Sequence, residues 1–302
     1  MTLEQLRIFV AVAEREHVTR AASALGLTQS AVSSAIAALE ARHDARLFDR
    51  VGRHIELTAS GRLFLDEARA VLARAHAAEL MLGELGTLSR GTLNIHASQT
   101  IASYWLPARL VRFREAWPKI EVHLAAGNTE TVARAVLEGS ADIGFAEGAV
   151  RVPALSSTEV GSDHLVLVVG ASHALAKRRR VGVTELASAQ WVVREPGSGT
   201  RSEMEAALAA LKLPIHARDI ALELPSNEAV RTAVEAGAGV AGMSELVAAP
   251  GLRAGTLRRL DIEMPRRPFL ALRHRERRLG KAAEALLALC SKSIAARTPK
   301  KK

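Results

Sequence analysis

The chain has 302 residues, 48% of them apolar, so it can bury cores for two or three domains and is not intrinsically disordered. Its single cysteine, Cys290, excludes a disulfide framework and a cysteine-rich metal site. The net charge of +9 does not itself indicate nucleic-acid binding, because residues 1–91 carry 11 basic and 11 acidic residues and the excess lies further along the chain.

The N-terminus and the longest uncharged run indicate a protein without a membrane part. The first residues, "MTLEQLRIFV", lack the basic segment and apolar core of a signal peptide. Ala21–Leu39 contains Gly, Ser, Thr and Gln, so it is too polar for a membrane span. We therefore expect a cytoplasmic protein, which suits the single cysteine.

The N-terminal segment predicts three helices. The first is indicated by four apolar residues on one face: Leu3, Leu6, Val10 and Ala13. A second, short helix is expected over Arg20–Leu25 with Thr19 as its N-cap, and Gly26 supplies a tight turn. Thr28 can then cap a third helix over about Gln29–His43.

The third predicted helix has two contrasting faces. One is apolar (Val32, Ile36, Leu39), and the other is small and uncharged (Ser30, Ser33, Ser34, Ala37). A solvated helix face would carry Lys and Glu, whereas a face that meets base edges and phosphates can carry hydroxyl and amide groups. Helix, glycine turn and helix form the helix-turn-helix pattern, and the alternative is a plain helical hairpin. We expect DNA contacts from Thr28, Gln29, Ser30, Ser33 and Ser34.

The next segment, "RLFDRVGRHIELT", predicts two short strands around Val51–Gly52–Arg53. Such a hairpin, or wing, would carry Arg50, Arg53 and His54 at its tip. Arginines there suit phosphate or minor-groove contacts, so Arg50 and Arg53 join the expected DNA-binding residues. Taken singly, each could equally be an ordinary surface arginine.

The segment "SGRLFLDEARAVLARAHAAELMLGEL" predicts a long helix with a repeating apolar seam. The seam runs through Phe64, Ala68, Val71, Ala75, Ala78, Leu82 and Leu85. The length of the helix and its exposed charges favour packing against a partner helix from a second copy of the chain. The alternative is one helix that packs on its own domain.

After Gly91 the pattern predicts two similar α/β lobes. "TLNIHA", "IEVHLA" and "ADIGFA" are expected strands that alternate with helices, and a second pass of the same order begins near Asp163. The two passes align at an offset of 98, which matches Gly139 with Gly237 and the candidate helix caps Asn128 and Ser226. A last strand, Phe269–Leu272, and a helix, Leu279–Leu289, are expected to return to the first lobe.

Two corners at strand ends are rich in hydrogen-bond donors. Ser98–Gln99–Thr100 follows the first strand, and "GSGT" at 197–200 leads into a helix that begins near Arg201. Hydroxyls and backbone N–H groups at a helix start favour an anion, although Ser98 and Thr200 could be ordinary N-caps. We expect a small anion between the lobes, bound by Ser98, Gln99, Thr100, Ser198, Gly199, Thr200 and Arg201.

The sequence gives little support for an enzyme. The ten histidines show no metal-ligand spacing, G-x-S-x-G is absent, and "GSGT" lacks the Gly-Lys-Ser/Thr of a Walker loop. We therefore expect no catalytic residues, no metal and no cofactor. A solute-binding protein of the periplasmic type, without a DNA role, is the alternative function, but it would need the export signal that the N-terminus lacks.

The segment from Phe9 to Gly61 resembles the winged helix-turn-helix of LysR-type transcriptional regulators. The matching elements are Ala21–Ala22, Leu25, Gln29–Ser30, Val32–Ser33, Ile36, Leu39–Glu40, Leu47–Phe48, Arg50, Arg53, Leu57–Thr58 and Gly61. The chain departs from the family at Ser34, where a basic residue is common, and at Ala35, where a longer polar side chain is common. These departures concern the operator sequence and not the mode of docking.

The resemblance implies an effector-responsive regulator of double-stranded operator DNA. It implies a winged helix-turn-helix over 1–58, a linker helix for dimerisation over 59–90 and an effector-binding domain over 91–302. That domain would comprise two Rossmann-like lobes like those of periplasmic binding proteins, lobe I at about 91–162 and 268–302 and lobe II at about 163–267. A homodimer through an antiparallel pair of linker helices, a homotetramer and RNA polymerase as a partner are further implications.

Overall fold

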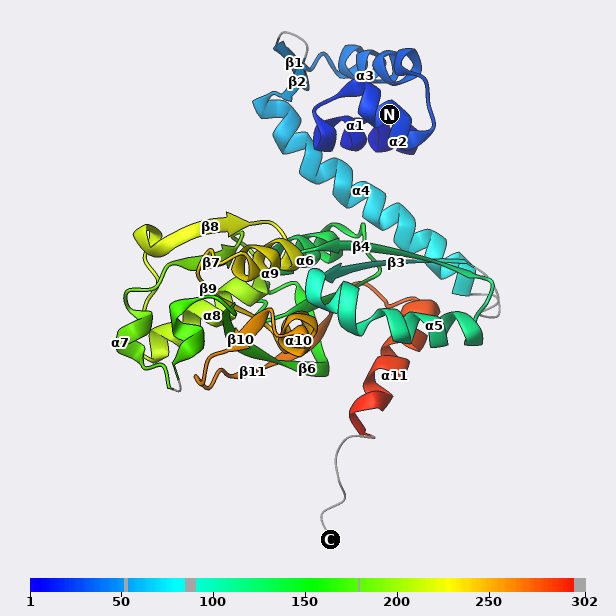
Figure 1. Cartoon of the computed structure of the whole chain (residues 1–302). Coiled ribbons are helices and arrows are strands. Elements are labelled where there is room, and N and C mark those ends of the chain that lie inside the picture. Colours follow the sequence, from blue (N-terminus) through cyan, green and yellow to red (C-terminus); the bar gives the residue numbers. More distant parts are fainter. Residues whose placement is uncertain (52–53, 85–90, 179, 296–302) are drawn as a thin grey trace. The chain divides into compact units, whose positions relative to one another are not determined.

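The computed structural model describes residues 1–51, 54–84, 91–178 and 180–295 (Figure 1). The chain divides into two compact units. The N-terminal unit comprises Met1–Leu85 with Glu138–Ser140, and the C-terminal unit comprises Gly86–Leu137 with Ala141–Lys302.

The N-terminal unit confirms the predicted helices and hairpin. Its elements are α1 (Leu3–Arg15), α2 (Val18–Leu25), α3 (Gln29–His43), β1 (Phe48–Val51), β2 (His54–Leu57) and α4 (Ala59–Glu84). The helices pack around a core in which Leu6, Phe9 and Val32 are almost completely buried. β1 and β2 pair antiparallel, with Val51 opposite His54.

The caps of the second and third helices show one confirmed prediction and one error. Thr28 caps α3, since its hydroxyl accepts a hydrogen bond from the N–H of Ala31 at 3.2 Å. Gly26 ends α2 with φ at 67°, a left-handed conformation that glycine adopts without strain. The prediction of Thr19 as the N-cap of α2 was wrong: the helix begins at Val18, and the imidazole of His17 accepts from the N–H of Arg20 at 3.5 Å.

The predicted seam of α4 divides between two roles. Phe64 and Ala68 belong to the core of their own unit, and the ring of Phe64 lies 4.9 Å from that of Phe9. Further along, Val71 is 40% exposed and Ala78 is exposed. The alternative of a helix packed on its own domain therefore holds for the first part of the seam. The side chain of Leu82 and all of Leu85 lie outside the described residues.

The C-terminal unit contains the two predicted lobes. In lobe I, β3 (Gly91–Ser98) lies between β4 (Ile120–Gly127) and β5 (Ile143–Glu147), parallel to both. In lobe II, β7 (Trp191–Arg194) lies in the same way between β8 (Ile220–Leu224) and β9 (Val240–Ser244). The strand order repeats, which confirms the duplication read from the sequence.

Helices follow the strands in each lobe. Lobe I has the π-helix η1 (Ile101–Trp105), α5 (Pro107–Ala116) and α6 (Thr129–Glu138), and lobe II has α8 (Gly199–Ala210) and α9 (Asn227–Glu235). α11 (Lys281–Ala295) packs beside α5 in the core of lobe I, as predicted for the returning segment (Figure 1). The sequence did not predict η2 (Ala174–Lys177), α7 (Val183–Leu186), η3 (Ala217–Asp219), α10 (Glu245–Ala254) or β10 (Leu257–Arg259).

One long strand, β6 (Leu155–Gly170), runs from lobe I into lobe II. Its residues up to His164 pair with β11 (Arg266–His274), and from Leu165 onward it pairs with β9. The sequence predicted only the second half of β6, because the first half, "LSSTEVGS", is polar. One continuous strand therefore crosses between the two lobes at Asp163–Leu165, beside the start of β11, where the chain returns from lobe II.

Candidate functional site

The predicted DNA-reading face of α3 is exposed in the N-terminal unit. Gln29, Ser30 and Ser34 are exposed and Ser33 is half-buried, whereas Val32, Ile36 and Leu39 on the opposite face are buried. The hydroxyl of Thr28 lies 3.1 Å from that of Ser30, so the N-terminal turn of α3 presents a cluster of hydroxyls. Arg53 and the side chains of Arg50 and His54 lie outside the described residues.

The two predicted effector corners are brought together in the C-terminal unit. Ser98 and Thr100 of lobe I and Ser198 and Thr200 of lobe II are all at most 4% exposed. Ser98, Thr100 and Thr200 hydrogen-bond with charged side chains that the sequence reading did not single out. These are Glu147 at the end of β5 and Arg267 on β11. We call the group the interlobe network: Ser98, Gln99, Thr100, Glu147, Asp163, Arg194, Thr200, Asn227 and Arg267.

Arg267 lies at the centre of the interlobe network and is fully buried. Its Nη1 donates to the hydroxyl of Thr200 at 2.9 Å, and its Nη2 donates to Asp163 Oδ2 at 2.9 Å. The same Nη1 lies 3.7 Å from Glu147 Oε1, and the hydroxyl of Ser98 donates to the other oxygen of Glu147. A buried anion–cation pair therefore lies between the two corners.

A second set of hydrogen bonds joins the lobes directly. The amide of Asn227 in lobe II donates to the hydroxyl of Thr100 at 3.1 Å and accepts from Arg194. The side chain of Gln99 accepts from the N–H of Asn227 at 3.0 Å and donates to the carbonyl of Pro225 at 2.9 Å. Lobe I and lobe II are thus held together by groups of the chain itself.

The charge of Arg201 is already paired, and Gly199 packs against lobe I. The guanidinium of Arg201 pairs with Glu205 at 2.8 Å and Glu223 at 2.6 Å, and Ser198 caps α8 by accepting from the N–H of Arg201 at 3.4 Å. A Cβ at Gly199 would lie 2.2 Å from the carbonyl oxygen of Glu147. Only glycine therefore lets the start of α8 approach lobe I so closely.

The carboxyl of Glu147 has an unusual electrostatic environment. Complete burial raises its pKa, and the nearby charge of Arg267, a hydrogen bond with Thr100 and the charge of Arg194 oppose that rise. The sequence signal that could have indicated Glu147 is its place directly after the apolar strand "IGFA". For Arg267, the signal is a basic residue just before the strand "FLAL".

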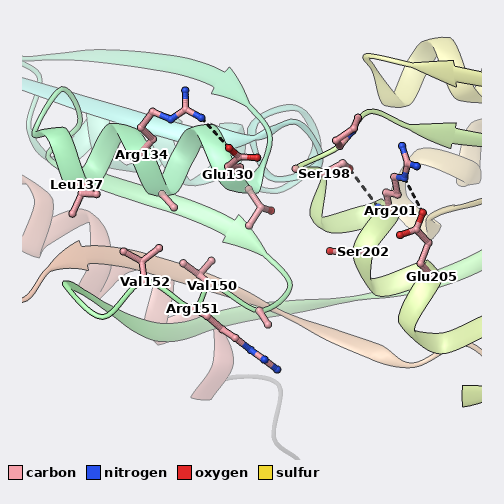
Figure 2. Close-up of a pocket in the computed structure, with 15 residues that line it drawn as sticks. Glu130, Arg134, Leu137, Val150, Arg151, Val152, Ser198, Arg201, Ser202 and Glu205 are labelled. Atoms are coloured by element: carbon pink, nitrogen blue, oxygen red, sulfur yellow. Dashed lines mark hydrogen bonds and ion pairs between the residues drawn. The ribbon is translucent and has the colours of Figure 1, made fainter. Parts of the chain in front are cut away.

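A cavity of about 660 Å³ opens beside the network, between α6, the loop after β5 and α8 (Figure 2). α6 contributes Glu130, Arg134 and Leu137 to its wall. The remaining walls include Val150, Arg151, Val152, Ser198, Arg201, Ser202 and Glu205. Glu130 pairs with Arg134 at 2.9 Å across one turn of α6.

The residues that the structure describes offer no reactive thiol and no cluster of metal ligands. Cys290 is buried in lobe I, and burial raises the pKa of its thiol to about 12. Among residues 1–51, 54–84, 91–178 and 180–295, no cluster of three His, Cys, Asp or Glu could hold a metal ion. In the same described stretches no single helix is long and apolar enough to cross a membrane; only α2 and α3 taken together, with a 108° bend, reach that length and composition.

Family models identify both parts of the chain. Residues 3–62 match the model "Bacterial regulatory helix-turn-helix protein, lysR family" and residues 86–295 match "LysR substrate binding domain". The chain is a LysR-type transcriptional regulator. The LysR family consists of transcriptional regulators, which are not enzymes. The match to a helix-turn-helix model also disfavours the alternative of a solute-binding protein without a DNA role.

Relatives of this LysR-type regulator span nearly its whole length. The uncharacterized HTH-type transcriptional regulator YeiE of Escherichia coli (strain K12) is 36% identical over 292 residues, which cover 96% of this chain and 97% of YeiE. The crystal structure of CbnR, a LysR family transcriptional regulator, superposes with a TM-score of 0.68 at 22% identity, covering 97% of this chain and 99% of CbnR.

The regulatory domain of CcmR from Synechocystis PCC6803, solved in complex with 2-PG, has a TM-score of 0.61. It is 24% identical and covers 68% of this chain and 97% of the CcmR chain. At these identities both structures support the fold of the LysR-type regulator alone.

Proposed function

We propose that this regulator acts in the cytoplasm and binds operator DNA in response to a small anionic effector held between lobes I and II. Residues 1–58 would bind DNA, 59–90 would form the dimer contact and 91–302 would bind the effector. The observation that supports this most is the interlobe network, in which Ser98 of lobe I donates to the carboxyl of Glu147 and Arg267 lies between that carboxyl and Thr200 of lobe II. The complex of CcmR with 2-PG supports a small-molecule role for this part of the fold.

The effector would compete with Glu147 for its donors. Ser98 and Arg267 already contact the carboxyl group of Glu147, and Arg267 also donates to Thr200, so another anion of similar size can take the place of that carboxyl. Burial raises the pKa of Glu147 because it disfavours the charged carboxylate. Moving that carboxylate out of its buried position therefore offsets part of the free energy that the exchange costs. An anion that contacts both lobes would favour their closed arrangement, and couplings of about 1–3 kcal/mol give a 5–150-fold response.

Valine substitutions at Thr100 and Thr200 test the effector site. Thr→Val keeps the shape of the side chain and removes the hydroxyl, so each variant should bind the effector at least about tenfold more weakly. A thermal-shift screen of sulfur, phosphorus and carboxylate anions would supply the ligand, and calorimetry would measure its affinity. Thr184→Val, at an exposed position on α7, is the matched control. Wild-type affinity in both variants would place the effector elsewhere.

We also propose that the N-terminal turn of α3 reads bases in the major groove. Gln29→Ala should lower affinity for the operator by about 1–3 kcal/mol and leave binding to an unrelated duplex nearly unchanged, because amide contacts to base edges carry specificity. The operator would be selected from a random duplex library, and affinities would be measured by fluorescence anisotropy. Gln190→Ala, an exposed glutamine of the C-terminal unit, should bind both duplexes as wild type does. An equal loss on both duplexes would contradict base reading.

The exposed part of the α4 seam is proposed as the dimer contact. Val71 is 40% exposed, and Val71→Glu would place a charge in an apolar contact, at a cost of several kcal/mol if unpaired. Light scattering at micromolar concentration should show a smaller assembly for this variant than for wild type. Val183→Glu, at a residue 39% exposed on α7, should keep the wild-type mass. A wild-type chain that is monomeric would contradict the proposal.

A further inference from the structure

The cavity beside the interlobe network is larger than a small inorganic anion requires. Its volume of about 660 Å³ lies in the range of pockets that bind organic ligands of tens of atoms, about 300–1,000 Å³. One wall is apolar and includes Ala133, Leu137, Val150 and Val152. Leu137 is 38% exposed, so this wall has apolar surface that a ligand could cover.

Among the described residues that line the cavity, one cation has no charged partner. Arg134 pairs with Glu130 at 2.9 Å, and Arg201 pairs with Glu205 at 2.8 Å (Figure 2). Arg151, in the loop after β5, is exposed and makes no ion pair or hydrogen bond with the residues that the structure describes. The cavity therefore joins an apolar wall to a guanidinium that can meet an acidic group.

The cavity is separate from the interlobe network. The start of α8 closes the space between them, because a Cβ at Gly199 would lie 2.2 Å from the carbonyl oxygen of Glu147 and 2.5 Å from the hydroxyl of Thr129. Neither Glu147, Thr100, Thr200 nor Arg267 lines the cavity. A ligand there would contact α6 of lobe I and α8 of lobe II without entering the network.

We propose that this cavity is a second ligand site, for an amphipathic organic anion with an apolar body and one acidic group. The apolar body lies against Leu137, Val150 and Val152, and the acidic group pairs with Arg151. The ligand class follows from these residues and is independent of the anion proposed for the network. Because the ligand contacts both lobes, it can bias their arrangement alongside the effector.

Octanoate is a suitable probe, with octanol and inorganic phosphate as controls for its two halves. Calorimetry on the full chain should show saturable octanoate binding and much weaker binding of either control. Arg151→Gln and Leu137→Gln should each weaken octanoate binding at least about fivefold, by loss of the charge pair and of the apolar contact. Arg112→Gln, an exposed arginine on α5, and Leu211→Gln, at a leucine 40% exposed, are the matched controls and should bind as wild type does.

Three outcomes would overturn the proposal. The first is no saturable octanoate binding up to about 10 mM, where a millimolar site would be occupied. The second is wild-type octanoate affinity in both Arg151→Gln and Leu137→Gln. The third is loss of octanoate binding in Thr100→Val, which would place octanoate in the interlobe network. That third outcome would leave the proposed effector site intact, so failure of the two proposals can be told apart.

Discussion

Arg267→Met should lower the free energy of unfolding of the C-terminal unit by about 3–5 kcal/mol, the usual cost of removing one partner from a buried ion pair. Methionine leaves the carboxylates of Glu147 and Asp163 buried near each other without the guanidinium that lies 3.7 and 2.9 Å from them. Urea unfolding followed by tryptophan fluorescence measures this unit alone, because all three tryptophans, Trp105, Trp117 and Trp191, belong to it.

The neighbouring residue provides the control for this variant. Arg266 pairs with Glu159 at 3.0 Å, but both side chains are about half exposed, so Arg266→Met should cost at most about 1 kcal/mol. If the two variants lost equal stability, the buried pair would have no special role.

The loss in Arg267→Met should also depend on pH. Burial raises the pKa of Glu147, and the charge of Arg267 is the strongest of the effects that lower it. Removing Arg267 should therefore raise the pKa of Glu147 further. A carboxyl whose folded pKa is raised contributes stability that is full below its unfolded pKa and is lost as the pH rises through its folded pKa. The difference between variant and wild type should therefore shrink at acid pH. A difference that stays constant with pH would contradict a charged Glu147 as its cause.

Gly199→Ala should lower the free energy of unfolding by about 1–3 kcal/mol, and the two corners of the interlobe network should separate. The added Cβ meets backbone and not a flexible side chain, since the carbonyl oxygen of Glu147 would lie 2.2 Å away. The better helix propensity of alanine, up to about 1 kcal/mol, offsets only part of this cost. Urea unfolding gives the stability, and hydrogen exchange at Ser98–Thr100 and Ser198–Thr200 reports the separation.

A second glycine next to a helix serves as the control. A Cβ at Gly182, the N-cap of α7, would meet only the far end of the Glu185 side chain, at 2.9 Å. Gly182→Ala should therefore change stability by less than about 1 kcal/mol and leave exchange at both corners unchanged. Equal exchange in Gly199→Ala and wild type would show that lobe I and lobe II tolerate the methyl group without moving apart.

Local signals in the sequence predicted most of the fold. The cap at Thr28, the turn at Gly26 and the apolar face of Val32 and Ile36 each act within one or two helical turns, so they can be read without knowing the tertiary structure. The repeat at an offset of 98 predicted two similar lobes because each pass carries its own local signals, such as the candidate caps Asn128 and Ser226. His17 was missed as a cap because histidine is not among the favoured N-cap residues.

The candidate site was less predictable because its parts come from distant segments. The hydroxyls of Ser98, Thr100 and Thr200 follow strands or begin helices, which is a local pattern, and the structure brings them together. Arg267 and Asp163 join them only through the pairing of β11 with β6, which depends on the whole sheet. The division of the α4 seam between Phe64 and Val71 depends in the same way on the position of α1.

The continuous strand β6 limits the kind of movement that lobe I and lobe II can make. A flexible linker would let them swivel freely, but β6 is hydrogen-bonded to β11 up to His164 and to β9 from Leu165 onward. Separation of the lobes must therefore twist or bend this hydrogen-bonded ribbon, which resists the deformation elastically. We expect the deformation to concentrate between His164 and Leu165, where the pairing partner changes. A paired ribbon resists such deformation, so we expect small displacements of the lobes and a return to their starting arrangement when a ligand leaves.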